Sequence, residues 1–583
     1  MTSNESNQTL KRLFSYAKPY RMYLIGALFS ALVSVLLSLL LPVFLGKAVD
    51  FIAGPGKVDF NGLLRTIAYM ALFIAGSCIF QWTMSFCTSK ITYFTVKDLR
   101  NSVYEKLNIV PLEVIDKTPH GNIINTMVND IDAVSDGLLQ GLTQLFSGIM
   151  TIVGTIGLML SINLGIGFAV ILLTPLSLFV ASFISRRTYR KFTEQTEIKG
   201  EMGGLIEEML GNQKLIKAFS YEDRALESFK EINARLHKCG VMAQFYSSLT
   251  NPCTRFVNGV VYASVGILGA FSAIRGNLSV GQLTSFLAYA NQYTKPFNEI
   301  SGVITEFQSA LASAKRVFAL IDLEPEPSDE GLLSGIQADG RVSLKNVYFS
   351  YDKSVKLIED LNLEVKPGSR IAIVGPTGSG KTTVINLLMR FYDADKGTIE
   401  VSGVDIKKMQ RKALRNMYGM VLQDTWLFEG NVRENIAYGK EDATEEEIIN
   451  AAKAAYAHSF IERLPNGYDT VITKEGSNLS QGQRQLLSIA RVMLIKPPML
   501  ILDEATSNID TRTEIHIQKA FARLMEGRTS FIVAHRLSTI KESDLILVMN
   551  QGRIVEQGSH EELLRKEGFY HKLYYSQFHV TQT

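Results

Sequence analysis

The stretch Gly375-Pro376-Thr377-Gly378-Ser379-Gly380-Lys381-Thr382 decides the fold of the second half of this chain. It fits the phosphate-binding pattern G-x-x-x-x-G-K-[ST] at every fixed position. The apolar run 371–374 before it predicts a buried strand, and residues 383–390 after it predict the start of a helix. A strand, a glycine-rich turn and a helix N-terminus surround one anion with backbone N–H groups and a positive dipole end. We therefore predict that this stretch binds a nucleoside triphosphate.

The side chains of this loop have predicted roles in holding ATP and Mg²⁺. Gly378 and Gly380 let the backbone approach a phosphate that a Cβ atom would hold off. Lys381 is expected to meet the β- and γ-phosphates, and the Thr382 hydroxyl to ligate Mg²⁺. The residues predicted to contact ATP here are Gly375, Pro376, Thr377, Gly378, Ser379, Gly380, Lys381, Thr382 and Thr383. A chance glycine-rich turn is the alternative, and the flanking strand and helix patterns argue against it.

The composition places an apolar domain in the first half of the chain. At 583 residues the chain is too long for one core, so two or three domains are expected. Charged residues are only 20%, yet the second half looks like an ordinary α/β enzyme, so the apolar excess lies before it. A net charge of +3 without a basic tail does not indicate a nucleic-acid partner. The four cysteines lack C-x-x-C and zinc-ligand spacing, so no disulfide or metal framework is predicted.

Six apolar runs in the first half are predicted to cross a lipid bilayer. They lie at about 22–45, 63–87, 141–162, 165–185, 256–275 and 283–307, the last being more polar. Such runs are long enough to cross a hydrocarbon core of ~30 Å as helices. A single run could be a buried core helix, but six in succession make that alternative a poor one. The first half is therefore predicted to be an all-α, six-span membrane domain.

Loop charges predict the orientation of these spans. The loop between spans two and three carries Lys90, Lys97, Arg100, Lys106 and Lys117, and the loop between spans four and five begins with four basic residues within 186–191. The other loops carry few, although Lys47 and Lys57 make the first of them a mild exception. Lys and Arg mark the cytoplasmic side of a cell membrane. Both termini and the second half of the chain are therefore expected on the cytoplasmic side of this membrane.

Two stretches between spans, 88–139 and 187–254, are much longer than a connection requires. Both interleave charged and apolar residues at helical spacing, which predicts that the spans continue out of the membrane as helices. The candidate turns at their far ends are 111–116 and 218–223. Solvated loops are the alternative, and reach and amphipathicity favour contact of these turns with the nucleotide domain.

The domain boundaries follow from a linker at 322–340. It contains an acidic, proline-broken segment, Glu324-Pro325-Glu326-Pro327-Ser328-Asp329-Glu330. Residues 1–321 form the predicted transmembrane domain. Residues 341–583 alternate apolar strands with helical stretches, the α/β pattern expected around a phosphate-binding loop.

Two strands beyond the loop end in groups suited to phosphate chemistry. The apolar run 499–502 leads into Asp503 and Glu504. Asp503 is predicted to hold Mg²⁺ through water, and Glu504 to polarise the attacking water as general base. The run 531–534 ends in His535, for which contact with a γ-phosphate is favoured over a surface structural role.

The pentapeptide Leu479-Ser480-Gln481-Gly482-Gln483, some twenty residues before Asp503, resembles the signature of the ATP-binding-cassette (ABC) family. With six preceding spans, the chain resembles a half-size ABC exporter of the multidrug type over nearly its whole length. The resemblance implies a six-helix transmembrane domain followed by an α/β P-loop NTPase domain. It also implies that the five signature residues complete the ATP site of a second half-transporter chain.

The resemblance assigns roles to further residues. Tyr351 is expected to stack on adenine, and Gln423 to ligate Mg²⁺, with Thr382 and Asp503, and to sense the membrane domain. Asp510 matches the D-loop that crosses between cassettes, and His535 matches the switch histidine. The turns near 111–117 and 217–224 fall where the family keeps its coupling helices.

Two departures from the family pattern concern what the chain offers a partner. Gln481 stands where the signature usually has glycine, and Thr473-Lys474 stands where a Gly-Glu pair is common, with Glu475 one place later. The resemblance to heterodimeric bacterial multidrug exporters, in which one site hydrolyses and the other mainly holds ATP, favours a heterodimer. A homodimer remains the alternative.

Span six is the predicted wall of a substrate cavity. Its candidate residues are Tyr289, Tyr293, Phe297, Glu299 and Glu306. The aromatic residues could instead pack against neighbouring spans, whereas ionisable groups at membrane depth usually face a cavity.

We predict ATP-driven export of amphipathic drugs or lipids by alternating access. A lipid flippase, a peptide exporter and, from another class, an ATP-gated channel are the alternatives.

Overall fold

The computed structural model describes residues 3–52, 58–422, 425–473, 476–503, 509–534 and 537–578. It divides into two compact units. Unit 1 contains Met1–Asn108 and His120–Leu323, and unit 2 contains Ile109–Pro119 and Glu324–Thr583. The short segment Ile109–Pro119 therefore belongs to the unit of the phosphate-binding loop, although it follows a helix of the other unit.

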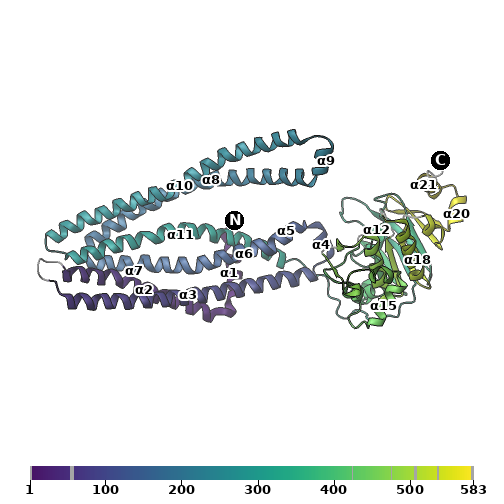
Figure 1. Cartoon of the computed structure of the whole chain (residues 1–583), viewed down its shortest axis with the longest axis horizontal. Coiled ribbons are helices and arrows are strands. Elements are labelled where there is room, and N and C mark those ends of the chain that lie inside the picture. The colour runs from purple at the N-terminus through teal and green to yellow at the C-terminus, as the bar shows by residue number, and fades with distance from the viewer. Residues whose placement is uncertain are drawn as a thin grey trace. The chain divides into compact units, whose positions relative to one another are not determined.

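Among its described residues, the regular elements of unit 1 are all helices (Figure 1). Its elements are α1 (Ser3–Ala17), η1 (Lys18–Tyr20), α2 (Arg21–Ile52), α3 (Phe60–Ile109), α5 (His120–Asn125), η2 (Thr126–Asp130), α6 (Ile131–Gln140), η3 (Gly141–Leu145), α7 (Phe146–Ile162), α8 (Leu164–Gly211), α9 (Gln213–Ala218), α10 (Glu222–Ile274) and α11 (Val280–Ile321). Among the described residues, four helical stretches are long and apolar enough to cross a membrane: Asn7–Ile52, Phe60–Ile109, His120–Ile162 and Glu222–Ile274. Helices α8 and α11 cover the other two predicted spans.

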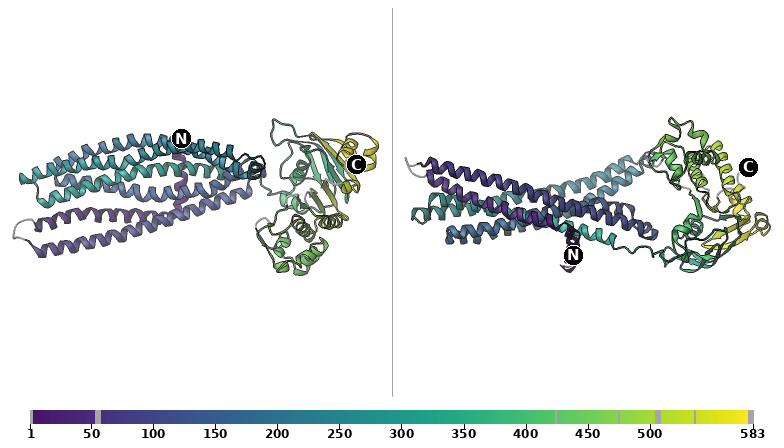
Figure 2. Two further views of the ribbon diagram at one scale, coloured as in Figure 1. Left: turned by 45° about the horizontal axis from the view of Figure 1, so that its top comes forward. Right: turned by 90° about the horizontal axis from the view of Figure 1, so that it is seen from below.

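The predicted helical extensions are present. Helices α3, α8 and α10 are 50, 48 and 53 residues long, so each is about 75 Å in length, well beyond a bilayer core. Helices α8 and α10 form one long hairpin, which α9 closes (Figures 1 and 2). The sequence placed this turn at 218–223, whereas α9 already occupies Gln213–Ala218. The polar N-terminal residues, for which no element was predicted, form α1.

Helix α11 packs closely against α2 where α2 carries a proline. Pro42 has no N–H to donate within its helix. The Ser285 hydroxyl donates to the Pro42 carbonyl oxygen at 2.7 Å, and the Tyr289 hydroxyl donates to the Leu39 carbonyl oxygen at 2.6 Å. A Cβ atom at Gly281 would lie 2.0 Å from the carbonyl oxygen of Gly46, so only a glycine permits this approach.

Unit 2 is built on a six-stranded sheet with the order β12-β11-β3-β10-β9-β6. Its strands are β3 (Arg370–Val374), β6 (Tyr418–Val421), β9 (Met499–Asp503), β10 (Thr529–Val533), β11 (Leu545–Asn550) and β12 (Arg553–Gly558). Five strands run parallel, and β12 is antiparallel to β11. Successive residues along β3 point to opposite faces, so that Ile371 and Ile373 enter one hydrophobic core while Ala372 and Val374 enter another.

Smaller sheets and helices surround this sheet (Figure 2). A four-stranded sheet has the order β2-β1-β4-β5, and β7 pairs with β8. These strands are β1 (Val342–Phe349), β2 (Ile358–Val365), β4 (Lys396–Val401), β5 (Val404–Asp405), β7 (Gly430–Asn431) and β8 (Val471–Ile472). The helices are α4 (Leu112–Lys117), α12 (Lys381–Leu388), η4 (Ile406–Lys408), α13 (Arg411–Asn416), α14 (Val432–Ala437), α15 (Glu445–Ala454), α16 (His458–Ile461), η5 (Gly467–Asp469), α17 (Gln481–Ile495), α18 (Thr511–Met525), α19 (Leu537–Lys541), α20 (His560–Arg565) and α21 (Phe569–Phe578).

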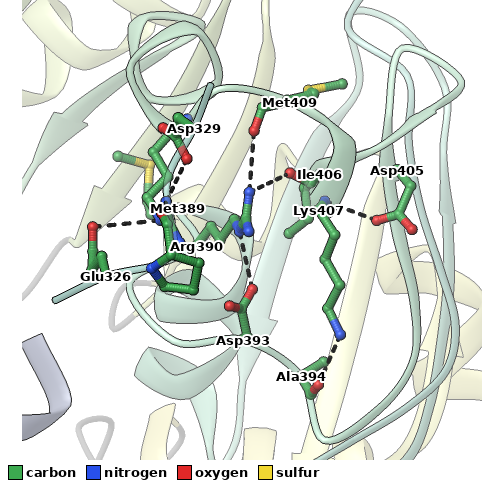
Figure 3. A network of polar contacts seen from close by, with 12 residues as sticks. Glu326, Asp329, Met389, Arg390, Asp393, Ala394, Asp405, Ile406, Lys407 and Met409 are labelled. Atoms are coloured by element: carbon green, nitrogen blue, oxygen red, sulfur yellow. Dashed lines mark hydrogen bonds and ion pairs between the residues drawn. The ribbon is translucent and has the colours of Figure 1, made fainter. Parts of the chain in front are cut away.

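The acidic segment before β1 is bound to unit 2 through buried arginines (Figure 3). Arg411 pairs with Asp329 and lies 3.5 Å from the Glu326 carboxylate, and its backbone N–H donates to Asp329 at 2.7 Å. Arg390 beside it donates to the carbonyl oxygens of Ile406 and Met409 at 3.0 and 3.1 Å. The acidic residues that mark the linker in the sequence therefore fix it to the domain that follows.

Candidate nucleotide-binding site

The phosphate-binding loop runs from the end of β3 to the start of α12, as the sequence predicts. Gly380 has φ +99° and caps the N-terminus of α12, a conformation that side chains rarely adopt. A Cβ atom at Gly375 would lie 2.2 Å from the Met549 carbonyl oxygen. Both glycines are thus required by the backbone, and the first N–H groups of α12 face the concave side of the loop.

Lys381 is folded back into this loop. It is 9% exposed, and its Nζ donates to the carbonyl oxygens of Gly375 and Pro376 at 2.9 and 3.0 Å. Burial lowers the pKa of Lys381, and the Asp503 carboxylate opposes this effect. Ser379 is 2% exposed, and its hydroxyl has no hydrogen-bond partner within the described part of the chain. A phosphate entering the loop would give the Ser379 hydroxyl a partner and the Lys381 ammonium group a counter-ion.

The ends of three parallel strands gather the other predicted groups at the same edge. Strand β10 lies between β3 and β9, and Val533 pairs with both Ile373 and Asp503. Thr382, on the first turn of α12, is exposed, and Asp503 is half-buried at the end of β9. A hydroxyl and a carboxylate are the oxygen ligands that Mg²⁺ takes in proteins, so the donor set fits this ion. Gln423, Glu504 and His535 lie outside the described residues.

Tyr351 lies in an aromatic cluster that the sequence did not reveal. Its ring centroid is 4.9 Å from those of Phe349 and Tyr392, both edge-on, and the Asn386 amide of α12 donates to its hydroxyl at 2.9 Å. Tyr392 is 7% exposed, and its hydroxyl donates to Asp116 of α4. Burial and this hydrogen bond to Asp116 raise the pKa of Tyr392.

The cluster thus connects α12 and the predicted adenine-stacking residue to α4, one of the two predicted turns. The expected contact of 111–116 with the nucleotide domain is present, because α4 lies in unit 2. The sequence did not predict which residue Asp116 would contact, because Asp116 and Tyr392 are separated by 276 positions.

The signature segment forms the N-terminus of α17. Ser480 caps the helix by accepting from the Gln483 N–H, while the Gln483 side chain accepts from the Ser480 N–H at 2.9 Å. Leu479 and Gly482 are buried, and Gln481 is half-buried on the first turn. The free N–H groups of this turn form an anion-binding end. Lys474 lies outside the described residues.

The predicted D-loop residue lies beside the signature. A Cβ atom at Gly482 would lie 2.4 Å from the Thr513 methyl group, so α17 and α18 are in close contact. Asp510 caps α18 by accepting from the Thr513 N–H at 2.9 Å, and this hydrogen bond lowers the pKa of Asp510. Asp510 is exposed.

Of the side chains predicted to line a substrate cavity on α11, some are buried and others are exposed in this structure. Tyr289 is fully buried and Tyr293 is 4% exposed, so these two rings pack against neighbouring helices, which was the alternative to a cavity wall. The Leu39 carbonyl oxygen of α2 explains the position of Tyr289, because it accepts the hydrogen bond that the Tyr289 hydroxyl donates. Glu306 and Lys295 are exposed, whereas the side chains of Phe297 and Glu299 lie outside the described residues.

Comparison with known families matches the two parts of this chain in turn. Residues 24–297 match the family described as ABC transporter transmembrane region, and residues 358–507 match the ABC transporter domain. The chain belongs to the ABC transporter family. Unit 1 is accordingly its helical transmembrane domain, and unit 2 holds its nucleotide-binding cassette, as the resemblance of the sequence implied.

Full-length relatives define the type of ABC transporter. The chain is 40% identical over 528 residues to a fatty acid ABC transporter ATP-binding/permease protein of Mycobacterium bovis, covering 90% of this chain and 83% of that protein. It is 35% identical to an ATP-dependent lipid A-core flippase of Desulfotalea psychrophila, covering 98% and 99%. A solved bacterial Atm1-family ABC exporter with ATP bound superposes with a TM-score of 0.80 at 29% identity, covering 97% and 99%. The chain is thus a half-size, ATP-driven exporter of a kind that works as a dimer.

Proposed function

We propose that this exporter moves amphipathic compounds that carry a charged head and an apolar tail, with lipids as the main class. The observation that carries the proposal is on α11, where Lys295 and Glu306 are both exposed while Tyr289 and Tyr293 are buried. Eleven residues make about three helical turns, so the two charges lie on one face, roughly 16 Å apart. Charges of both signs on one face suit a charged headgroup better than a wholly apolar drug.

The relatives support the same class of cargo. Fatty acids and the lipid A core, which the names of these two relatives specify, both join acyl chains to ionised groups. Ionisable residues in a transmembrane helix are costly unless they serve a cavity, which again assigns Lys295 and Glu306 to the cargo.

ATP binding is proposed to drive export by closing two cassettes on two nucleotides. Lys381 would exchange its two carbonyl acceptors for the β- and γ-phosphates, and the α17 N-terminus of the second chain would face the γ-phosphate. Thr382 and Asp503 would hold Mg²⁺, which supplies charge neutralisation on the phosphates when bound. Glu504 would take the proton of the attacking water, and His535 would contact the γ-phosphate. ATP shifts the equilibrium only because it binds the closed state better than the open one.

The second chain is proposed to be a different half-transporter. Gln481 keeps its backbone N–H but fills space that glycine would leave to the γ-phosphate, so this chain offers an altered signature. A heterodimer would confine that signature to the partner's site.

The cassettes are proposed to face the cytoplasm, because basic residues concentrate in the stretches 88–139 and 187–254.

Transport in proteoliposomes tests the cargo class. Glu306→Gln should reduce transport of a cationic amphipathic dye at least roughly fivefold more than that of a neutral one, since one cavity charge is lost. Basal ATPase activity should survive. Glu227→Gln, at an exposed position of α10, is the matched control and should change neither rate. Equal losses of cationic and neutral transport would contradict the assignment of Glu306.

A further inference from the structure

An apolar cavity lies beneath the N-terminal helix of unit 1. Its volume is about 190 Å³, and its walls come from α1, α2, α3, α6, η3 and α11. The lining includes Leu13 and Phe14 of α1, Ile91 of α3, Leu138 of α6 and Phe307 of α11. An apolar cavity of roughly 150 Å³ already stays dry and accepts a small apolar ligand. This space therefore suits a hydrocarbon chain rather than water.

A π-helical turn in the backbone forms part of the wall of this cavity. Gly141 and Leu145, at the two ends of the π-helical turn η3, both line the cavity. A Cβ atom at Gly141 would lie 3.2 Å from the Phe307 ring, so a larger residue would press into the wall. Single π-helical turns cost helix regularity and occur mostly at functional sites. The turn is thus a second, independent feature of the same place.

The mouth of the cavity carries an unneutralised positive charge. Phe14 lines the cavity and is 47% exposed, which places it at the opening. Lys11 stands three residues before Phe14 on α1, and Lys18 stands four residues after it at the start of η1, so the two lysines flank Phe14 along the chain. Both lysines are exposed, and within the described part of the chain neither has an ion-pair partner.

Three carboxylates on or beside α1 already have hydrogen-bond or ion-pair partners. Glu5 pairs with Lys315 at 3.1 Å, and Asp322 accepts two hydrogen bonds from Arg12 at 2.5 and 2.7 Å. Asp98 accepts from the Tyr20 hydroxyl at 2.7 Å. An anion from outside the chain is therefore the natural counter-ion of Lys11 and Lys18.

We propose that this cavity binds one acyl chain of an anionic phospholipid, whose phosphate is held by Lys11 and Lys18. Helix α1 leads through η1 into α2, which contains the first apolar run predicted from the sequence, and α1 has an apolar face on the cavity, as an interfacial helix does. Basic residues beside a span attract anionic lipids of the adjacent leaflet. The bound lipid fastens α1 to α11, and this role does not depend on which compound the transporter exports.

Native mass spectrometry of the purified full-length dimer, titrated with phosphatidylglycerol, tests the proposal. Ala17 lines the cavity, and Ala17→Phe fills it; the variant should weaken lipid binding at least roughly tenfold, because several methylenes lose their apolar site. Ala270→Phe, the same change at an exposed position of α10, is the control and should bind like wild type. An equal loss in both variants, or no loss in Ala17→Phe, would overturn the proposal.

A surface variant keeps the test independent of folding. Lys11→Gln with Lys18→Gln should weaken phosphatidylglycerol binding roughly tenfold to thirtyfold and leave phosphatidylcholine binding unchanged, since about one charge interaction per lysine is lost. Arg65→Gln, at an exposed position on α3, is the matched charge control. Uptake of oleate but not of phosphatidylglycerol by the wild type would also overturn the proposal, because a free fatty acid would then be the occupant.

Discussion

The two short helices that close the long helical hairpins, α4 and α9, differ in what covers them. Helix α4 belongs to the compact unit of the cassette, and its Asp116 accepts a hydrogen bond from the buried Tyr392. Around α9, by contrast, Leu215 and Phe219 are 56% and 74% exposed. Large apolar side chains concentrated on a turn mark an interaction surface. We therefore expect α9 to dock on another surface of the assembled transporter.

The largest expected effect is on ATP hydrolysis, which is proposed to drive the movements that α4 and α9 transmit. Glu504→Gln should leave ATP binding intact and slow hydrolysis at least ~10²-fold, because only the general base is lost. ATPase activity and nucleotide binding of the purified dimer measure the two properties separately. Equal turnover in the variant and the wild type would contradict the assignment of Glu504. In an asymmetric heterodimer, the same change in the partner should matter little.

Removing the apolar surface of α9 should uncouple the two domains. Phe219→Ser should lower transport per ATP hydrolysed roughly tenfold, because an exposed aromatic anchor is the type of residue that dominates an interface. Phe192→Ser, at a 41% exposed position on α8, is the matched control and should keep its coupling ratio. If both variants transport equally well, Phe219 does not dock on a partner, and the contrast with α4 fails.

The α4 contact should give a smaller effect confined to this chain. Tyr392→Phe removes the hydroxyl that donates to Asp116, an exposed acceptor, and should destabilise the cassette by about 1 kcal/mol. Thermal unfolding of the full-length protein measures this loss, and drug- or lipid-stimulated ATPase activity should fall more than basal activity. Tyr348→Phe, at a 37% exposed position, is the control. No change relative to this control would mean that the hydrogen bond couples nothing.

The smallest effect is expected at the signature. Gln481→Gly restores the usual residue and should raise ATPase activity less than roughly threefold, since the backbone N–H groups of α17 are unchanged. In a homodimer the change acts at both sites, whereas in a heterodimer it acts only at the partner's site. Measuring the ATPase activity of the double variant, with Gln481→Gly and Glu504→Gln in the same chain, distinguishes the homodimer from the heterodimer. A rise that survives Glu504→Gln comes from the partner's site.

The parts of the site that the sequence predicted are those set by local patterns. The strand, loop and helix around Lys381 are contiguous, so their geometry followed from a few residues. Asp503 and the signature were also placed correctly, because each stands at the end of a regular element. Long helical extensions such as α3 were predictable from the length of their amphipathic runs.

The missed features all depend on tertiary packing. The buried position of Tyr289 results from the carbonyl oxygen of Leu39, 250 positions away from it. The hydrogen bond between Tyr392 and Asp116 joins two segments that no periodicity connects. The cavity under α1 requires the positions of six elements at once, so no single stretch of sequence indicates it.

ATP-dependent transport by the reconstituted dimer tests the central claim most directly, namely that this chain is half of a pump powered by its own phosphate-binding loop. Wild-type proteoliposomes should move a fluorescent lipid when Mg²⁺ and ATP are added. Lys381→Ala should abolish this movement, because the loop loses its one charge against the phosphates. Movement at the same rate in Lys381→Ala, or in the wild type without ATP, would contradict the account.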